Sequence, residues 1–289
     1  MRGSGVIGSR AGRGVALGLA IAVFVGAEVR PEVEGKGLAA ATLLPPVVAE
    51  LEPVLAVSVD SSVCGRSGVL RVVQAMPEEA IRLPLRWDAP RPDDVWYRWN
   101  PVTEGNLAGK AAPRPLGAGD EALAPADPGV YRLEVGGAGD QREFDEFTLI
   151  VKVPFRAMEG GYLKGYLIGR YPRTQSTGPY APPEGFIEVT PENRDLPLSE
   201  HFTLGEFLTK NQHNVWPKYV VVDMKLIDKL ELVLQDLNAR GIRADDMVIM
   251  SGYRTPQYNA QGVGRGRASL SRHQYGDAAD VWVENDGDW

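Results

Sequence analysis

The chain contains three histidines and one cysteine, Cys64, so few of its residues can bind a transition metal. A site built on several cysteines is excluded, and any metal must be held by histidine and carboxylate ligands. His273 and Asp280 are the leading candidates, because an imidazole nitrogen and a carboxylate oxygen both suit Zn²⁺. The alternative is that these two residues form an ordinary surface pair. His201 and His213 flank a predicted helix and are expected to be surface or packing residues.

The residues between the two candidate ligands indicate how they converge. Gly276 permits a tight bend shortly after His273. Residues 278–283 are then predicted to form a strand, and strand alternation places Asp280 on the same face as Ala278. The small alanine leaves room beside the carboxylate. The sequence therefore predicts a bent loop that carries an imidazole, followed by a strand that carries a carboxylate.

Several elements are predicted to position this pair. Thr203 and Glu206 have the spacing of a capping box that opens a short helix. Apolar residues from 226 to 237 recur along one stripe of an α-helix, and Gly241 follows as a C-terminal stop. The other predicted elements are a buried strand at 247–250 and a helix start at Thr255-Pro256.

Two linked motifs resemble the signature of a known family. Residues 251–259 read Ser-Gly-Tyr-Arg-Thr-Pro-Gln-Tyr-Asn, and residues 271–280 follow the pattern S-x-H-x-x-G-x-A-x-D. In this order the motifs resemble the zinc D-Ala-D-Ala carboxypeptidase family, which includes dipeptidases and murein endopeptidases that act on peptidoglycan stem peptides. The resemblance covers about residues 200–289. It implies an α+β zinc-peptidase domain at residues 201–289, with Zn²⁺ as cofactor and peptidoglycan peptides as partners.

The resemblance also implies a role for each matching residue. His273 and Asp280 would be zinc ligands, and Ser271 would line the substrate cleft. Arg254 would be the catalytic residue that polarises the scissile carbonyl and binds the oxyanion, where one well-placed donor commonly contributes about 3 to 4 kcal/mol. The alternative for Arg254 is a structural ion pair at the end of the strand predicted at 247–250.

The chain departs from the family pattern after Asp280. In the family, the third zinc ligand is a histidine well downstream, preceded by an acidic general base, whereas this sequence ends soon afterwards at Trp289. We therefore expect a truncated copy that binds zinc weakly or not at all. Tyr253 and Asn259, which also match the family motif, would hold the loop in shape.

Short β-prone runs separated by turn residues predict an all-β immunoglobulin-like sandwich at residues 55–154. Residues 127–131 resemble the tyrosine corner of such domains, in which a tyrosine hydroxyl bonds back to the preceding turn. Because the single cysteine has no disulfide partner, packing around Trp87, Trp96 or Trp99 would have to hold the sandwich together. The predicted strands are 55–59, 68–74, 81–87, 94–100, 129–135 and 147–153.

The first 27 residues have the layout of a secretory signal peptide, with arginines before an apolar run at 15–25 that closes on small residues. A membrane-spanning helix needs about 20 apolar residues, so no permanent membrane span is expected after signal cleavage. An uncleaved leader or a wrongly assigned start codon is the alternative.

Residues 28–54 are predicted to form a linker, and residues 155–200 are predicted to form a loop-rich connector. The expected location is periplasmic or secreted.

The overall charge narrows the possible partners. The chain has 31 Lys and Arg against 38 Asp and Glu, a net charge of −7, so it has no basic field to attract nucleic acid. The favoured function is that of an exported zinc-dependent peptidase acting on peptidoglycan stem peptides or cross-links. The alternatives are a non-catalytic peptidoglycan-binding protein and an adhesion or scaffold protein that depends on the sandwich.

Overall fold

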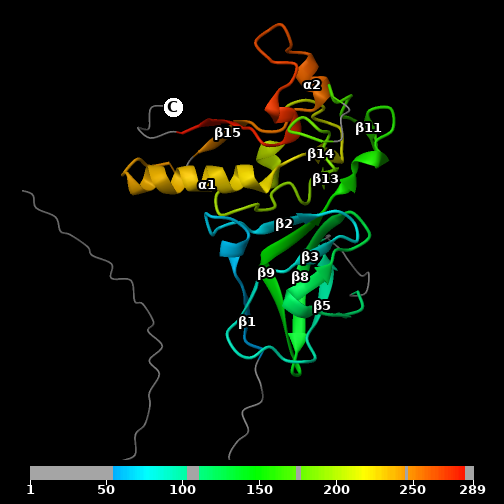
Figure 1. Cartoon of the computed structure of the whole chain (residues 1–289). Helices are drawn as coiled ribbons and strands as arrows, with labels where there is room; N and C mark the ends of the chain where they lie inside the picture. The colour runs from blue at the N-terminus through cyan, green and yellow to red at the C-terminus, as the bar shows by residue number, and fades with distance from the viewer. Residues whose placement is uncertain (1–54, 103–110, 174–176, 245–246, 284–289) are drawn as a thin grey trace, which may run out of the picture. The chain divides into compact units, whose positions relative to one another are not determined.

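The computed structural model describes residues 55–102, 111–173, 177–244 and 247–283 (Figure 1). All of them fall within the unit Leu51–Trp289. The predicted signal peptide at 1–27 and the linker at 28–54 lie outside the described residues. Within the described ranges, no helix combines the length and the apolar character needed to span a bilayer.

The N-terminal part of the described chain is built mainly from strands (Figure 1). Its largest sheet has the order β2-β9-β8-β5-β6, in which β2 runs parallel to β9 and the other neighbours are antiparallel. Two antiparallel pairs, β1–β4 and β3–β7, accompany this sheet. The strands are β1 (Val57–Val59), β2 (Val72–Ala75), β3 (Ala80–Arg82), β4 (Leu85–Trp87), β5 (Trp96–Pro101), β6 (Arg114–Pro115), β7 (Glu121–Leu123), β8 (Gly129–Gly137) and β9 (Asp140–Val151).

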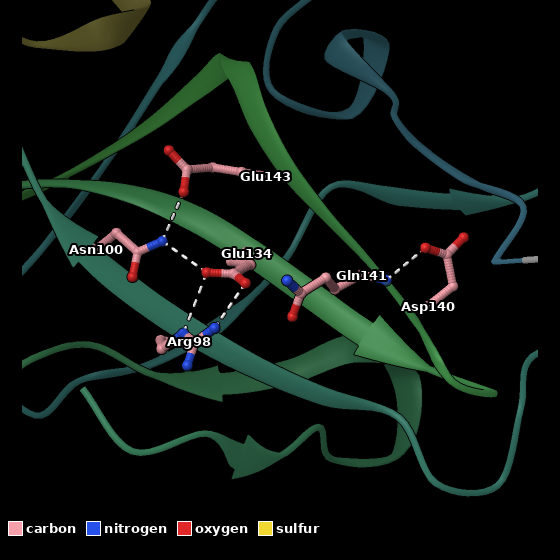
Figure 2. A network of polar contacts seen from close by, with 6 residues as sticks. All are labelled: Arg98, Asn100, Glu134, Asp140, Gln141 and Glu143. Carbon is pink, nitrogen blue, oxygen red and sulfur yellow. Dashed lines mark hydrogen bonds and ion pairs between the residues drawn. The ribbon is translucent and has the colours of Figure 1, made fainter. Parts of the chain in front are cut away.

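The two faces of the five-stranded sheet differ in polarity. On β5, Tyr97 and Trp99 are buried in the apolar core. Arg98 and Asn100 alternate with them and bind Glu134 of β8 on the opposite face (Figure 2). The Nη2 atom of Arg98 lies 2.6 Å from Oε1 of Glu134, and Nδ2 of Asn100 lies 2.8 Å from Oε2. Glu134 is 2% exposed, so these contacts compensate a charge that would be costly to bury alone.

The tryptophans contribute unequally to the apolar core of the N-terminal strands. Trp99 is buried in the core. Trp87 packs at the edge of the same cluster, and its Nε1 donates to Asp120 at 3.1 Å. The Cζ atom of Arg98 lies over the Trp96 ring, 5.2 Å from the ring centre, on the polar face of the five-stranded sheet. The expected aromatic core is therefore formed by Trp99, and Trp96 is not part of it.

The last strand predicted for the N-terminal part is longer than the sequence indicates. The expected strand covers 147–153, but β9 already begins at Asp140. The turn before it has Ala138 and Gly139 at φ values of 52° and 80°, which is typical of a tight two-residue hairpin. The first residues of β9 are mostly charged and exposed, and Phe144 is the one buried among residues 140–146. This part of the strand has too little apolar alternation to be recognised from the sequence.

The segment predicted as a loop-rich connector contributes strands of its own. Strands β10, β13 and β14 form an antiparallel three-stranded sheet, which joins residues on both sides of the predicted boundary at residue 200. Strands β11 and β12 form a hairpin. The bounds are β10 (Val153–Pro154), β11 (Tyr162–Leu163), β12 (Tyr166–Leu167), β13 (Gly185–Val189) and β14 (Lys218–Val220).

The helix predicted at 226–237 is confirmed as α1, Met224–Ala239 (Figure 1). Asp223 caps its start, and Gly241 adopts a left-handed φ of 79° just beyond its end. Val233, which the sequence places on the apolar stripe, is 47% exposed instead. The buried apolar residues of the helix are Ile227, Leu230 and Leu234.

Two short helices adjoin the candidate site: η4 contacts β15 in space, and α2 follows Arg254 in the sequence. The capping box is confirmed at the 3-10 helix η4 (Leu204–Phe207), where the Thr203 amide donates to Oε2 of Glu206 at 2.6 Å. The predicted helix start at Thr255 is also confirmed. Its hydroxyl accepts from the amide of Tyr258 at the beginning of α2 (Pro256–Ala260).

Candidate functional site

The site is built on the antiparallel pair β15 (Val248–Ser251) and β16 (Asp280–Trp282). A β-bulge at Met250 shifts the register, so that Ser251 lies opposite Asp280. Bulges of this kind change the direction in which neighbouring side chains point. The pairing brings the end of the strand predicted at 247–250 next to the predicted carboxylate ligand.

A tight turn places His273 beside this strand pair. His273 lies on the 3-10 helix η5 (Arg272–Tyr275), which ends at Gly276 with φ 72° and ψ 15°. A Cβ atom on Gly276 would lie 2.4 Å from the backbone oxygen of Val221, so a side chain does not fit there. The carbonyl of Gly276 also accepts a hydrogen bond from the amide of Asp223 at 2.8 Å. The bend predicted after His273 is confirmed, and it requires glycine.

His273 and Asp280 face each other. The Nε2 atom of His273 lies 3.4 Å from Oδ1 of Asp280. On the other side of the ring, Nδ1 lies 2.8 Å from the carbonyl oxygen of Gly252. A carbonyl can only accept, so Nδ1 carries the proton in the neutral ring and Nε2 presents its lone pair toward Asp280. The histidine is 9% exposed, whereas the side chain of Asp280 is 56% exposed.

Arg254 is held against the same carboxylate. Its Nη2 atom forms an ion pair with Oδ2 of Asp280, and its Nε donates to Oγ of Ser251 at 2.9 Å. The backbone amide of Arg254 donates to the carbonyl of His273 at 3.0 Å. The ion pair that the sequence left as an alternative is thus present. It uses one edge of the guanidinium, and Nη1 makes no hydrogen bond to the described part of the chain.

The two candidate ligands can be tested for their fit to zinc. Two ligand atoms of a tetrahedral zinc at about 2.0–2.1 Å are about 3.3–3.4 Å apart. The observed separation between Nε2 of His273 and Oδ1 of Asp280 is 3.4 Å. A backbone carbonyl on the opposite ring nitrogen is one of the usual partners of a metal-binding histidine. The pair therefore fits zinc in chemistry and in spacing, although no cluster of three or more candidate ligands occurs among the described residues.

The structure does not bring Ser271 into this network. Ser271 lies at the N-cap of η5, two positions before His273, and it is partly buried. Its carbonyl accepts from the amide of Gln274 at 3.1 Å, which holds the first turn of η5. Its side chain makes no hydrogen bond to the residues described. Ser271 is therefore near the histidine in sequence, but in the described structure its side chain makes no hydrogen bond to His273, Arg254 or Asp280.

Tyr253 and Asn259 shape the loop that carries Arg254. The hydroxyls of Tyr253 and Tyr171 lie 3.0 Å apart, and burial raises the pKa of both phenols. The Nδ2 atom of Asn259 donates to the carbonyl of Ala268 at 2.9 Å and so closes the following loop. Because their pKa values are raised, Tyr171 and Tyr253 stay protonated under ordinary conditions, and the contact between their hydroxyls is a neutral hydrogen bond.

Two residues of the site were not identified from the sequence. Ser251 contacts Arg254 through its hydroxyl, and Gly252 contacts His273 through its carbonyl. Both precede Arg254 in the first motif, so the motif itself contained the signal for their position. The partner of Gly252 could not be found from spacing, because His273 lies 21 positions further along the chain.

The other histidines lie apart from this network. His201 contacts Glu231 of α1, with Nδ1 2.8 Å from Oε2 and its amide 2.9 Å from Oε1. Glu231 is 0% exposed. His213 is exposed, and in the described structure it contacts neither His273 nor Asp280. Neither histidine replaces a third ligand at the site.

Replacing His201 with alanine is expected to destabilise the protein by about 1–3 kcal/mol, because the buried carboxylate of Glu231 would lose its ring partner. Urea unfolding followed by circular dichroism would measure the change. His213→Ala provides the matched control, since loss of an exposed side chain should change stability by less than about 0.5 kcal/mol. Equal stability of the two variants would contradict the prediction.

The comparisons with known proteins agree with the motif-based resemblance. Residues 200–289 match the family model of Peptidase M15, a family of the zinc D-Ala-D-Ala carboxypeptidase type. The match includes every residue of the polar network described above. Neither the curated proteins nor the solved structures contain a significant match to the chain. The similarity to this family therefore concerns residues 200–289.

Proposed function

We propose that this chain is an exported zinc-dependent peptidase that cleaves peptide bonds in peptidoglycan stem peptides or cross-links. The observation that carries the proposal is the 3.4 Å separation between Nε2 of His273 and Oδ1 of Asp280, next to the guanidinium of Arg254. The match of residues 200–289 to Peptidase M15 supports the zinc and the peptidoglycan substrate. A family with this substrate favours a periplasmic or extracellular location.

Each residue of the site has a distinct task in this proposal. His273 and Asp280 hold the zinc ion, and the carbonyl of Gly252 keeps the histidine ring oriented. When bound, zinc supplies Lewis-acid chemistry that activates water and polarises a peptide carbonyl. Arg254 binds the substrate carbonyl oxygen through the edge of its guanidinium that Asp280 and Ser251 leave free. We assign Ser271 to the wall of the substrate cleft.

The strength of zinc binding follows from the number of ligands. Catalytic zinc sites usually have three protein ligands and one open position. The described residues supply two of them, His273 and Asp280. We therefore expect this pair alone to bind zinc more weakly than a complete catalytic site.

We further propose the arrangement of the rest of the chain. Residues 1–27 act as a signal peptide and 28–54 as a linker, residues 55–154 form an immunoglobulin-like sandwich, and residues 155–200 connect it to the peptidase segment 201–289. Support for the sandwich comes from the hydrogen bond between the Tyr131 hydroxyl and the Asp127 carbonyl, at 2.9 Å, and from the order of the five-stranded sheet.

Hydrolysis of defined muropeptides tests the proposed function. The purified chain is incubated with stem peptides that end in D-Ala-D-Ala and with cross-linked dimers, with added zinc or with a chelator, and products are identified by mass spectrometry. We expect zinc-dependent release of D-alanine or separation of the dimer. Sedimentation of the chain with insoluble cell wall, without cleavage at any zinc concentration, would instead support the non-catalytic peptidoglycan-binding protein. If the chain neither cleaved these substrates nor bound the cell wall, both the peptidase and the peptidoglycan-binding function would be contradicted.

A further inference from the structure

The segment that follows η4 runs beside the loop that carries the site. The amide of Tyr253 donates to the carbonyl of Phe207 at 2.9 Å. Two residues further along, the Oγ1 atom of Thr209 donates to the carbonyl of Tyr253 at 3.0 Å and accepts from the amide of Thr255 at 3.2 Å. One threonine hydroxyl thus joins the backbone groups on both sides of Arg254.

The hydroxyl of Thr209 and its two backbone partners are buried, and the buried hydroxyl of Tyr166 is a further polar neighbour of Thr209. Thr209 is 4% exposed, Tyr253 is 1% exposed and Thr255 is 0% exposed, so water has little access to the freed groups. A hydroxyl can donate one hydrogen bond and accept others, which is what the two backbone groups require. Loss of the hydroxyl would break the hydrogen bonds of a buried carbonyl and a buried amide, which is costly.

The backbone that Thr209 holds sets the orientation of the two chemically important side chains. The carbonyl of Gly252 contacts Nδ1 of His273, and the amide of Arg254 contacts the carbonyl of His273. Close packing adds to this control, because a Cβ atom on Gly252 would lie 2.6 Å from Cα of Phe207. The segment 207–209 therefore fixes the loop by direct packing and by three hydrogen bonds.

We propose that Thr209 is a positioning residue for the zinc site. Its hydroxyl holds the backbone of residues 252–255, so that the Gly252 carbonyl keeps the His273 ring in the orientation that presents Nε2 to the metal. The relation to zinc rests on the proposed function, whereas the effect on the histidine ring does not require it. In the described structure Thr209 makes no hydrogen bond to His273 or Asp280, and it acts through the backbone of residues 252–255.

Two isosteric or near-isosteric variants test this role. Thr209→Val keeps the shape and removes the hydroxyl, Thr209→Ser keeps the hydroxyl, and Thr148→Val changes another buried threonine, on β9. The full chain is labelled with ¹⁵N, and two signals are followed by NMR. These are the Nδ1–H resonance of the His273 ring and the hydrogen-exchange rate of the Thr255 amide.

We expect Thr209→Val to shift or remove the His273 ring resonance and to speed exchange of the Thr255 amide by about tenfold or more. Thr209→Ser should keep both signals near the wild type, and Thr148→Val should leave both unchanged. A wild-type ring resonance and wild-type exchange in Thr209→Val would overturn the proposal. Zinc titration of the same proteins separates this result from the proposed function. A wild-type chain that fails to bind zinc contradicts that function, while the ring resonance still decides the role of Thr209.

Discussion

Replacing His273 with alanine is expected to lower the affinity for zinc by at least about 100-fold. Loss of a residue that merely orients a ligand typically lowers metal affinity by 10–100-fold, and loss of the ligand itself should have a larger effect. His273 provides the nitrogen that lies 3.4 Å from Oδ1 of Asp280, and its removal leaves one candidate ligand of the pair. Calorimetric titration or competition with a chromophoric chelator would measure the change.

The control for this experiment is His213→Ala. It removes an exposed imidazole outside the network, so it accounts for non-specific zinc binding by surface histidines. Asp280→Ala is expected to act in the same direction as His273→Ala, because it removes the second candidate ligand and the ion-pair partner of Arg254. Retention of wild-type zinc affinity in both His273→Ala and Asp280→Ala would refute the metal site.

Gly276→Ala is expected to destabilise the protein by more than about 3 kcal/mol, a loss that belongs to the large end of single-residue effects. The left-handed conformation of Gly276 alone costs an alanine about 1–2 kcal/mol. The added Cβ would also lie 2.4 Å from the backbone oxygen of Val221, directly after β14, so relief requires movement of main chain. Chemical denaturation gives the change in the free energy of unfolding.

Gly264→Ala separates the two causes. Gly264 has a similar φ of 82°, but no atom lies within 4 Å of the position of its Cβ. Its replacement should therefore cost about 1–2 kcal/mol, the conformational part alone. The difference between the two variants measures the steric conflict at Gly276. If both variants lost the same stability, the close approach of Gly276 to Val221 would not restrict this position.

Gly276→Ala should also weaken zinc binding under conditions in which the variant remains folded. Gly276 ends the 3-10 helix that carries His273 and precedes the strand that begins at Asp280. Movement of the main chain at this bend would change the separation of the two candidate ligands. Gly264→Ala should bind zinc like the wild type, because Gly264 is not part of the chain between them.

The elements of the C-terminal part could be predicted where the signal is local. The apolar stripe of α1, the capping box at Thr203 and the cap at Thr255 all depend on residues a few positions apart. The bend at Gly276 is also local, because only glycine adopts the left-handed conformation at little cost. The same reasoning failed at β9, whose first residues are charged and exposed and so lack the alternation of a buried strand.

By itself, the sequence determined which residues are available for chemistry and the order in which they occur. Three histidines, one cysteine and two linked motifs were enough to select His273, Asp280 and Arg254. Only the tertiary structure decided how these groups meet. Arg254 forms an ion pair with Asp280, which lies opposite Ser251 in an irregular strand register, and Nδ1 of His273 contacts a carbonyl 21 positions away along the chain. Such contacts join distant segments whose relative placement is set by packing and by pairing register, and spacing along the chain contains no information about either.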